Sequence, residues 1–379
     1  MPDPGAASSF RVLQISHDYA GPFQNICRQF TQAFRHANVT TLFLRGKENQ
    51  SVIDATGGDR VIFFDQDEGS LRGIKIDAMV KLARLFRQCR YDVVVAHRYK
   101  AIYLAGIMSY FFPIPVLLGI AHEHNVFRRS SRALFVTFLR KNIQLLAVSD
   151  SVRNDIVKCC PSLGSQGRVH LLMNAIDPAI KTKFRDRGEV RNDLGIPEGI
   201  FCFGAVGRLV AKKDHKILLT AYARIAAADN CLVIVGAGPQ EKELKSQAIE
   251  LGIDHRVTFA GNIPDAYKMY GAFDAFVFTS GFKEAFGIVL LEAMLAEVPV
   301  VCSNAAGPME VIGDAGLIFE VGNADHLSHQ LKSIQVLDHA GRTALTDRAT
   351  KRLLDNYTME AFTRRLLALP VLKAYGTPA

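Results

Sequence analysis

The residues from 279 to 308, TSGFKEAFGIVLLEAMLAEVPVVCSNAAGP, decide the fold of this chain. Two short apolar runs, Phe273–Phe278 and Val298–Cys302, predict buried strands on either side of a central segment. In that segment apolar side chains recur at three-to-four spacing from Ile288 to Leu295, which predicts a buried helix. A strand, a helix and a second strand in this order predict a parallel sheet with helices packed on it.

Two carboxylates flank the turn between this strand and this helix. The free amides of a helix start favour phosphate oxygens, so we expect Phe286, Gly287 and Ile288 to lie against a phosphate group. Glu292 has apolar helical neighbours and therefore needs a partner, which we expect to be a diol such as that of a ribose. We expect Glu284, in the loop, to contact neutral hydroxyls of the ligand, with a solvated surface carboxylate as the alternative.

The segment from Glu284 to Glu292, EAFGIVLLE, resembles the E-x7-E motif of retaining glycosyltransferases of family 4, which have the GT-B fold. The second half of the chain restarts with an apolar strand, Phe201–Val206, and the loop GRLVAKKD. That loop resembles the family's G-R-L-x-x-x-K-G, with Asp214 in place of the last glycine. The resemblance implies an α/β protein with two Rossmann-like domains that face each other across a cleft.

The resemblance also implies that one domain binds the acceptor and the other binds the nucleotide sugar. Glycine, serine and glutamine cluster near residues 164–169, where we expect the boundary. Residues 1–167 would form an acceptor-binding domain, and residues 168–357 would form a nucleotide-sugar-binding domain. A last helix within residues 358–379 would join the N-terminal domain.

The resemblance places further donor-binding residues. Arg208 and Lys213 would hold the diphosphate, with a solvated basic turn as the structural alternative. Asn262 and Ile263 follow a predicted strand and would frame the nucleotide base. Gly21 follows the first predicted strand, where the family usually carries two glycines that approach the transferred sugar.

A histidine from the first domain would lie near the sugar and take part in catalysis. His122 is expected to fill this role because it ends a predicted strand. His97 and His124 are the alternatives, and a purely structural role remains possible for each. Neither a metal nor another cofactor is expected, since fixed cations offset the charge of the leaving diphosphate.

Positive charge is concentrated in the first half of the chain. Residues 1–167 contain 21 Lys and Arg against 13 Asp and Glu, whereas residues 168–379 contain 24 of each kind. This asymmetry indicates an anionic partner, either a membrane surface or a phosphorylated acceptor. The segment 127–142, FRRSSRALFVTFLRKN, resembles a basic amphipathic helix at a membrane, with an ordinary surface helix as the alternative.

Other features limit the classes of protein. The nearly uncharged residues 101–121 are split by Pro113 and Pro115, which predicts a short helix and a short strand instead of a membrane span. Seven cysteines without metal-binding spacing predict free, mostly buried thiols in a reducing compartment. Among them, Cys89 and Cys231 have apolar neighbours and are expected to be buried. A dehydrogenase is disfavoured because no loop reads G-x-G-x-x-G.

Taken with the resemblance to lipopolysaccharide core glycosyltransferases, these features lead to a specific expectation. The chain would move a hexose from a nucleotide-diphosphate sugar, with UDP favoured, to a lipid-linked saccharide. It would act in the cytoplasm at the inner face of the inner membrane and bind no nucleic acid. The alternatives are a capsule or O-antigen glycosyltransferase that uses a GDP-sugar, and a non-catalytic protein that binds nucleotide sugars.

Overall fold

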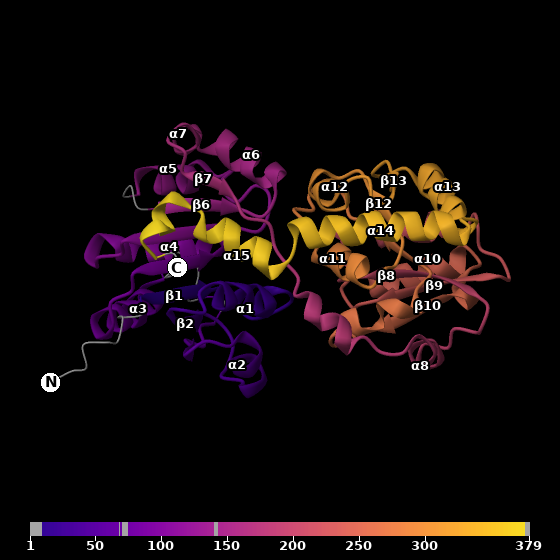
Figure 1. The fold of residues 1–379 in the computed structure, drawn as a ribbon, viewed down its shortest axis with the longest axis horizontal. Coiled ribbons are helices and arrows are strands. Elements are labelled where there is room, and N and C mark those ends of the chain that lie inside the picture. Colours follow the sequence, from indigo (N-terminus) through magenta and orange to yellow (C-terminus); the bar gives the residue numbers. More distant parts are fainter. Residues whose placement is uncertain (1–9, 68, 70–74, 140–142, 376–379) are drawn as a thin grey trace. The chain divides into compact units, whose positions relative to one another are not determined.

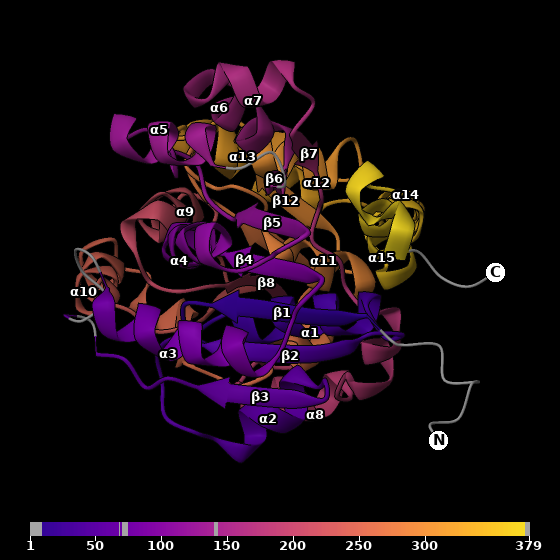
Figure 2. The same cartoon turned by 90° about the vertical axis from the view of Figure 1, so that its left-hand side faces the viewer.

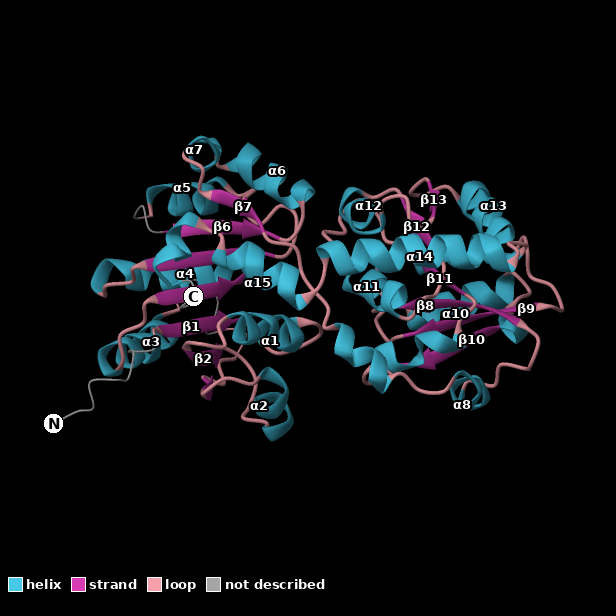
Figure 3. Ribbon diagram, viewed as in Figure 1, coloured by secondary structure: helices cyan, strands magenta, loops and turns pink. Residues whose placement is uncertain are grey.

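The chain forms two compact units, each built around a parallel sheet covered by helices (Figures 1 and 3). The computed structural model describes residues 10–67, 69, 75–139 and 143–375. The first unit comprises the described residues of Met1–Asn174 and Met359–Ala379, and the second comprises Ala175–Thr358. Both sheets are wound in the Rossmann manner, which confirms the predicted α/β fold with two Rossmann-like domains.

The sheet of the first unit has the strand order β3-β2-β1-β4-β5-β6-β7, and neighbouring strands pair in parallel (Figure 2). Every residue of β4, β5 and β6 is buried, as expected for a parallel sheet with both faces covered. The strands are β1 (Arg11–Ser16), β2 (Asn38–Phe43), β3 (Arg60–Phe63), β4 (Val93–His97), β5 (Val116–Ala121), β6 (Ile143–Ala147) and β7 (Val169–Leu171).

The first unit has helices between successive strands and one helix from the end of the chain. They are α1 (Phe23–Ala33), α2 (Gln50–Thr56), α3 (Ile76–Gln88), α4 (Arg98–Phe111), α5 (Ser130–Phe138), α6 (Asp150–Cys159), α7 (Pro161–Ser165) and α15 (Met359–Leu367). The predicted split at Pro113 and Pro115 is confirmed, because α4 ends before them and β5 begins after them. Within the described ranges, no helix is both long and apolar enough to cross a membrane.

Two features of the first unit differ from the expected boundaries. The unit extends to Asn174 instead of ending at residue 167, because β7 pairs with β6 and completes the first sheet. The expected helix over residues 127–142 is limited to α5, which begins only at Ser130. Arg140 and Lys141, which the sequence assigned to that helix, lie outside the described residues. The last helix, α15, packs on α1 through Phe30 and Phe362, whose ring centres are 5.1 Å apart.

The sheet of the second unit has the order β10-β9-β8-β11-β12-β13 and is also parallel. Its strands are β8 (Phe201–Val206), β9 (Asn230–Val235), β10 (Val257–Gly261), β11 (Ala275–Phe278), β12 (Val300–Ser303) and β13 (Leu317–Phe319). Its α-helices are α8 (Arg187–Asp193), α9 (His215–Tyr222), α10 (Glu241–Glu250), α11 (Ile288–Leu295), α12 (Ala306–Ile312), α13 (Ala324–Gln335) and α14 (His339–Asn356). Short 3₁₀ turns include η2 (Ala211–Lys213) and η4 (Ala266–Ala272).

The central helix of the second unit confirms the periodicity argument, since α11 begins at Ile288 and ends at Leu295 as predicted. The next helix, α12, begins at Ala306, so that Pro308 lies in its first turn. Proline is tolerated there because the N–H groups of the first helical turn have no acceptor within the helix, so the missing N–H breaks no helical hydrogen bond.

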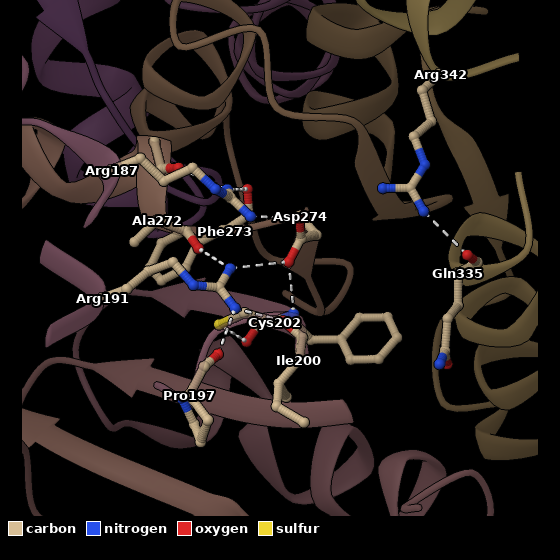
Figure 4. A network of polar contacts seen from close by, with 12 residues as sticks. Arg187, Arg191, Pro197, Ile200, Cys202, Ala272, Phe273, Asp274, Gln335 and Arg342 are labelled. Carbon is tan, nitrogen blue, oxygen red and sulfur yellow. Dashed lines mark hydrogen bonds and ion pairs between the residues drawn. The ribbon is translucent and has the colours of Figure 1, made fainter. Parts of the chain in front are cut away.

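Two arginines, the buried Arg191 and the exposed Arg187, lie at the N-terminal ends of β8 and β11 (Figure 4). Arg191 of α8 donates to Asp274 at 3.2 Å and to the carbonyls of Pro197 and Ile200. Arg187 binds the other oxygen of Asp274 at 2.7 Å. Asp274 also accepts from the backbone N–H of Cys202, at 2.8 Å, so that the carboxylate ties two strands to α8. The amino-terminal ends of these two strands are therefore held by a network of hydrogen bonds and ion pairs.

In both sheets the strand order reverses next to the first strand of the unit. The reversal lies between β1 and β4 in the first sheet and between β8 and β11 in the second. Open α/β sheets bind ligands outside the carboxyl ends of the strands at this switch point. The loops that leave β8 and β11, and those that leave β1 and β4, are therefore where functional side chains are expected.

Close packing at β8 gives a test of the second unit's core. A Cβ on Gly204 would lie 2.3 Å from ring atoms of Phe273, which is buried and cannot move aside. We expect Gly204→Ala to lower the free energy of unfolding by about 1–3 kcal/mol, measured by urea denaturation. Gly271→Ala, where no atom lies within 4 Å of the new methyl group, is the matched control. Equal unfolding midpoints for the two variants would contradict this packing.

Candidate functional site

The loop after β8 and the loop after β11 are fastened to each other at the switch point of the second sheet. The Thr279 hydroxyl donates to the carbonyl of Lys213 at 2.8 Å. The N–H of Gly281 donates to the carbonyl of Lys212 at 3.0 Å. Because these bonds involve the backbone of both loops, the side chains that the loops carry have defined positions.

Glu284 forms a buried ion pair with both lysines of the facing loop. Its Oε2 lies 2.7 Å from Nζ of Lys213, and its Oε1 lies 3.3 Å from Nζ of Lys212. The Glu284 side chain is only 9% exposed. Burial acts to raise the pKa of Glu284, but the two ammonium groups outweigh it and lower the pKa below its usual value. Sequence reasoning assigned Lys213 to a diphosphate and Glu284 to hydroxyls, and did not foresee that the two residues pair.

Arg208 lies in the same loop and remains exposed. Among the described residues, its side chain has no hydrogen-bond or ion-pair partner, so it is available to an anion. The loop ends at Asp214, whose φ of 49° is in the left-handed region. Aspartate tolerates this conformation better than most residues do, so the loop can adopt the same backbone turn with Asp214 in place of the expected glycine.

The start of α11 is open to an anion. Its N-cap residue, Gly287, has φ 100° and provides no side chain to cap the helix. A Cβ on Gly287 would lie 3.1 Å from the side chains of both Leu290 and Phe278, so glycine is required by conformation and by space. Phe286 is buried and makes an edge-to-face contact with Tyr357 at 5.8 Å, which anchors the turn. Phe286 can thus offer a ligand only its backbone.

Glu292 lies on the partly exposed face of α11, together with Ile288 and Val289, while most other residues of the helix are buried. Burial raises the pKa of Glu292 to about 7, and the hydroxyl of Tyr270 opposes this shift. The neighbouring polar group is Tyr270 of η4, which is fully buried, but its hydroxyl makes no hydrogen bond within the described residues, so the predicted need of Glu292 for a partner is not met inside this unit. Sequence reasoning missed Tyr270, because nothing local in the sequence connects η4 with α11.

The two base-binding candidates lie farther along the sheet. Asn262 and Ile263 follow β10, and β9 separates that strand from β8. The Asn262 side chain is exposed, and Ile263 lines a small pocket with Met269. The carbonyl of Gly261 accepts from the N–H of Gly236 at 2.7 Å, which fixes the start of this loop.

In the first unit, two of the three candidate histidines form a pair. His97 ends β4, His122 follows β5, and His97 Nδ1 lies 3.2 Å from His122 Nε2. Burial lowers the pKa of His97 to about 3 and holds the pKa of His122 well below its usual value. Both rings are therefore neutral near pH 7. His124 is partly buried outside this pair, and Gly21 lies exposed in the loop after β1 with φ 60°.

A further polar chain at the end of β1 was missed in the sequence. His17 Nδ1 lies 2.6 Å from Oδ2 of Asp18, and His17 Nε2 lies 3.1 Å from Nζ of Lys100 in α4. The only sequence signal was the His-Asp dipeptide directly after the first strand. The cysteines also need one correction, since Cys89 and Cys231 are partly exposed, whereas the sequence placed them in the core.

Comparison with known proteins shows that the chain is similar to glycosyltransferases. Residues 186–352 match the family described as glycosyl transferases group 1. An uncharacterized glycosyltransferase of Methanocaldococcus jannaschii is 26% identical over 72% of this chain and 73% of its own length. A lipopolysaccharide core biosynthesis glycosyltransferase of Rhizobium meliloti, LpsE, is 30% identical over 57% of this chain and 64% of its own length. The chain thus spans somewhat less than two thirds of LpsE.

A solved structure shows the same fold over almost the whole chain. Anabaena HepE, crystallised in complex with UDP-glucose, superposes with a TM-score of 0.80 at 19% sequence identity. The superposition covers 96% of this chain and 99% of HepE. At this identity the likeness establishes the architecture, and the chemistry of the site has to be argued from the residues of this chain.

The raised pKa of Glu292 makes a prediction for stability. Between the unfolded pKa near 4.5 and the folded pKa near 7, the folded state holds a proton that the unfolded state has lost, so stability falls as pH rises. Glu292→Gln cannot ionise and should therefore gain on the order of 2 kcal/mol relative to the wild type between pH 5 and pH 8. Urea unfolding at both pH values measures this gain, with the exposed Glu198→Gln as control. A pH-independent difference would show that Glu292 ionises freely.

Proposed function

We propose that this chain, a group 1 glycosyltransferase with the GT-B fold, moves a hexose from a UDP-sugar to a lipid-linked saccharide with retention of anomeric configuration. The observation that carries this proposal is the convergence of Lys212, Lys213 and the open start of α11 on Glu284 at the switch point of the second sheet. The similarity to LpsE supports an acceptor of the lipopolysaccharide core type. The similarity in fold to HepE, which binds UDP-glucose, is consistent with a UDP-linked donor.

The second unit would bind the donor. A diphosphate gains negative charge as the glycosidic bond breaks, so fixed positive groups stabilise the transition state more than the ground state. Arg208, Lys213 and the amides of Gly287 and Ile288 supply these groups in our proposal. Glu292, when ionised, would accept hydrogen bonds from the ribose diol. Asn262 and Ile263 would frame the base.

In our proposal Glu284 has one role in the donor-free protein and another in the donor-bound protein. Without donor, its carboxylate neutralises Lys213 and Lys212. Phosphate oxygens of the donor would compete for the same ammonium groups, which frees the carboxylate for the hydroxyls of the transferred sugar. Glu284 thus orients the sugar while the lysines hold the leaving group. The first unit would present the acceptor, while its Gly21 would take part in donor binding and its neutral His122 in catalysis, as the resemblance implies.

We further propose that the reaction needs no metal, because the cations of the loop after β8 take over the role of offsetting the diphosphate charge. The one Asp-x-Asp sequence of the chain is Asp65-Gln66-Asp67. It follows β3 in the first unit and not a donor-binding loop. Its Gln66 side chain donates to Asp77 at 2.5 Å, as part of the local structure.

The donor site is tested by transfer from UDP-hexose to extracted lipid acceptor and by calorimetric titration with UDP. Glu284→Gln should abolish transfer while binding UDP at least as tightly, because the two lysines lose their internal partner.

Arg208→Ala should lower the transfer rate by roughly a hundredfold, as for the loss of one oxyanion donor. Arg348→Ala, an equally exposed arginine on α14, is the control. Binding of UDP without turnover in the wild type would instead indicate a non-catalytic binder.

A membrane association of the first unit is supported by an apolar patch at the ends of α4 and α5. The apolar patch consists of Tyr110, Phe111, Leu134 and Phe138, of which Phe111 is 72% and Phe138 is 74% exposed. The Tyr110 hydroxyl donates to the carbonyl of Phe138 at 3.1 Å, which joins the two helix ends. Exposed aromatic side chains beside a basic segment are typical of surfaces that insert into lipid. We propose that this surface docks on the inner face of the inner membrane.

Co-sedimentation with vesicles that contain phosphatidylglycerol tests this surface. Phe111→Ser combined with Phe138→Ser should reduce the bound fraction by roughly tenfold, and high salt should release the wild type. Val336→Ser, which removes an exposed apolar residue from the second unit, should have no effect. Unchanged binding of the double variant would exclude the apolar patch as the docking surface.

A further inference from the structure

Two cysteines lie side by side on neighbouring strands of the second sheet. Cys202 is the second residue of β8, and Cys231 is the second residue of β9. The two residues are register partners in the parallel pairing of these strands. Register partners on neighbouring strands project from the same face of a sheet, so the two thiols face each other. We define Cys202 and Cys231 as the thiol pair.

The spacing of the two strands suits a disulfide bond. Neighbouring strands lie roughly 4.8 Å apart, and the Cα atoms of disulfide-linked cysteines lie roughly 4.4–6.8 Å apart. Phe203 and Leu232, which follow the two cysteines, project from the opposite face and belong to a hydrophobic core of the unit. The thiol pair therefore lies on the face of the sheet that does not carry this core.

The two thiols differ in their access to solvent. Cys202 is buried, whereas Cys231 is partly exposed. The Cys202 sulfur also lies 3.7 Å from the carbonyl oxygen of Phe203, which is a long contact for a hydrogen bond. A reagent from solution can therefore reach Cys231 directly, and it can reach Cys202 only through Cys231.

The surroundings of the thiol pair favour the thiolate of Cys231. A hydrogen bond from the Cys202 thiol lowers the pKa of Cys231, and the charges of Arg191 in α8 and Arg256 in η3 (Asp254–Arg256) lower it further, although burial and Asp274 oppose them. The same hydrogen bond, together with burial, raises the pKa of Cys202 well above its usual value. Figure 4 shows the sulfur of Cys202 beside the Arg191 guanidinium. The pair thus has one activated thiol and one partner held next to it.

We infer that the thiol pair is a redox-active modification site, at which a small disulfide such as oxidised glutathione converts Cys202 and Cys231 into a disulfide bond. The Cys231 thiolate attacks one sulfur of oxidised glutathione, and the broken S–S bond releases one glutathione thiolate. Cys202 then gives its proton to water and attacks the sulfur of Cys231, which releases the second glutathione thiolate. The two cysteines are oxidised, and one oxidised glutathione is reduced to two thiols.

The disulfide bond would cross-link β8 and β9 at the amino-terminal rim of the sheet. The N–H of Cys202 donates to Asp274 at 2.8 Å, so the bond would form directly beside the arginine network. The loops that carry the proposed donor site leave the opposite ends of β8 and β11. The chemistry of the thiol pair therefore does not depend on the proposed transfer reaction.

The main experiment exposes the full wild-type chain to glutathione buffers that range from fully reduced to fully oxidised. After an acid quench, the remaining thiols are alkylated in denaturant, and the peptides are identified by mass spectrometry. We expect a disulfide between Cys202 and Cys231 to form in the oxidised buffer and to be lost again in the reduced one. Failure to find this bond in fully oxidised glutathione overturns the inference.

Serine variants test the order of attack. Cys202→Ser lacks the second thiol and should accumulate a mixed disulfide between Cys231 and glutathione, whereas Cys231→Ser should leave Cys202 unmodified. Cys89→Ser removes a partly exposed cysteine of the first unit and should form the disulfide as the wild type does. Glutathione on Cys202 in the Cys231 variant, or none on Cys231 in the Cys202 variant, contradicts the inference.

Alkylation of the native wild type measures the activation of Cys231 without any substitution. Cys159 is also partly exposed, but burial raises its pKa. Near neutral pH, iodoacetamide should modify Cys231 roughly tenfold faster than Cys159, because the rate follows the fraction of thiolate. Equal rates at the two cysteines would contradict an activated thiol at position 231.

Discussion

The ion pair between Lys213 and Glu284 is the interaction on which the second unit's site depends. A carboxylate that is 9% exposed is stable only if cations offset its lost hydration, and Lys213 and Lys212 do so from the facing loop. The same contact draws the loop after β8 against the loop after β11, where backbone hydrogen bonds reinforce it. The pair therefore positions two lysines at the start of α11, where an anion is favoured for independent reasons.

The two units use one topology with different chemistry. In each sheet a polar contact bridges the strands at which the order reverses: Lys213 with Glu284 in the second unit, and Lys100 with His17 in the first. The pair in the second unit contains the carboxylate of Glu284, which partly neutralises the charge of Lys213. The pair in the first unit joins Lys100 to the imidazole of His17, which in turn contacts Asp18.

The sequence predicted those parts of the structure that depend on local patterns. The spacing of apolar residues predicted α11, and Pro113 and Pro115 predicted the break between α4 and β5. The contacts within the sites were not predictable, because they join distant segments. Tyr270 meets Glu292 only after η4 packs against α11, and His97 meets His122 only because β4 and β5 are neighbours. Likewise, β7 joins the first sheet through pairing with β6, which no local signal near residue 167 reveals.

The arginine network around Asp274 has a consequence for how such a protein can change over evolutionary time. Asp274, Arg191 and Arg187 bind α8 to the amino-terminal rim of the second sheet, at the opposite end of the strands from the loops that follow β8 and β11. Replacements in those loops, such as the aspartate at position 214, leave this rim untouched. Rigidity thus resides at the amino-terminal rim, and in our proposal selectivity resides in the loops at the carboxyl-terminal rim. On this proposal, a lineage can exchange one sugar for another at the carboxyl-terminal rim without endangering the folded state that the amino-terminal rim maintains.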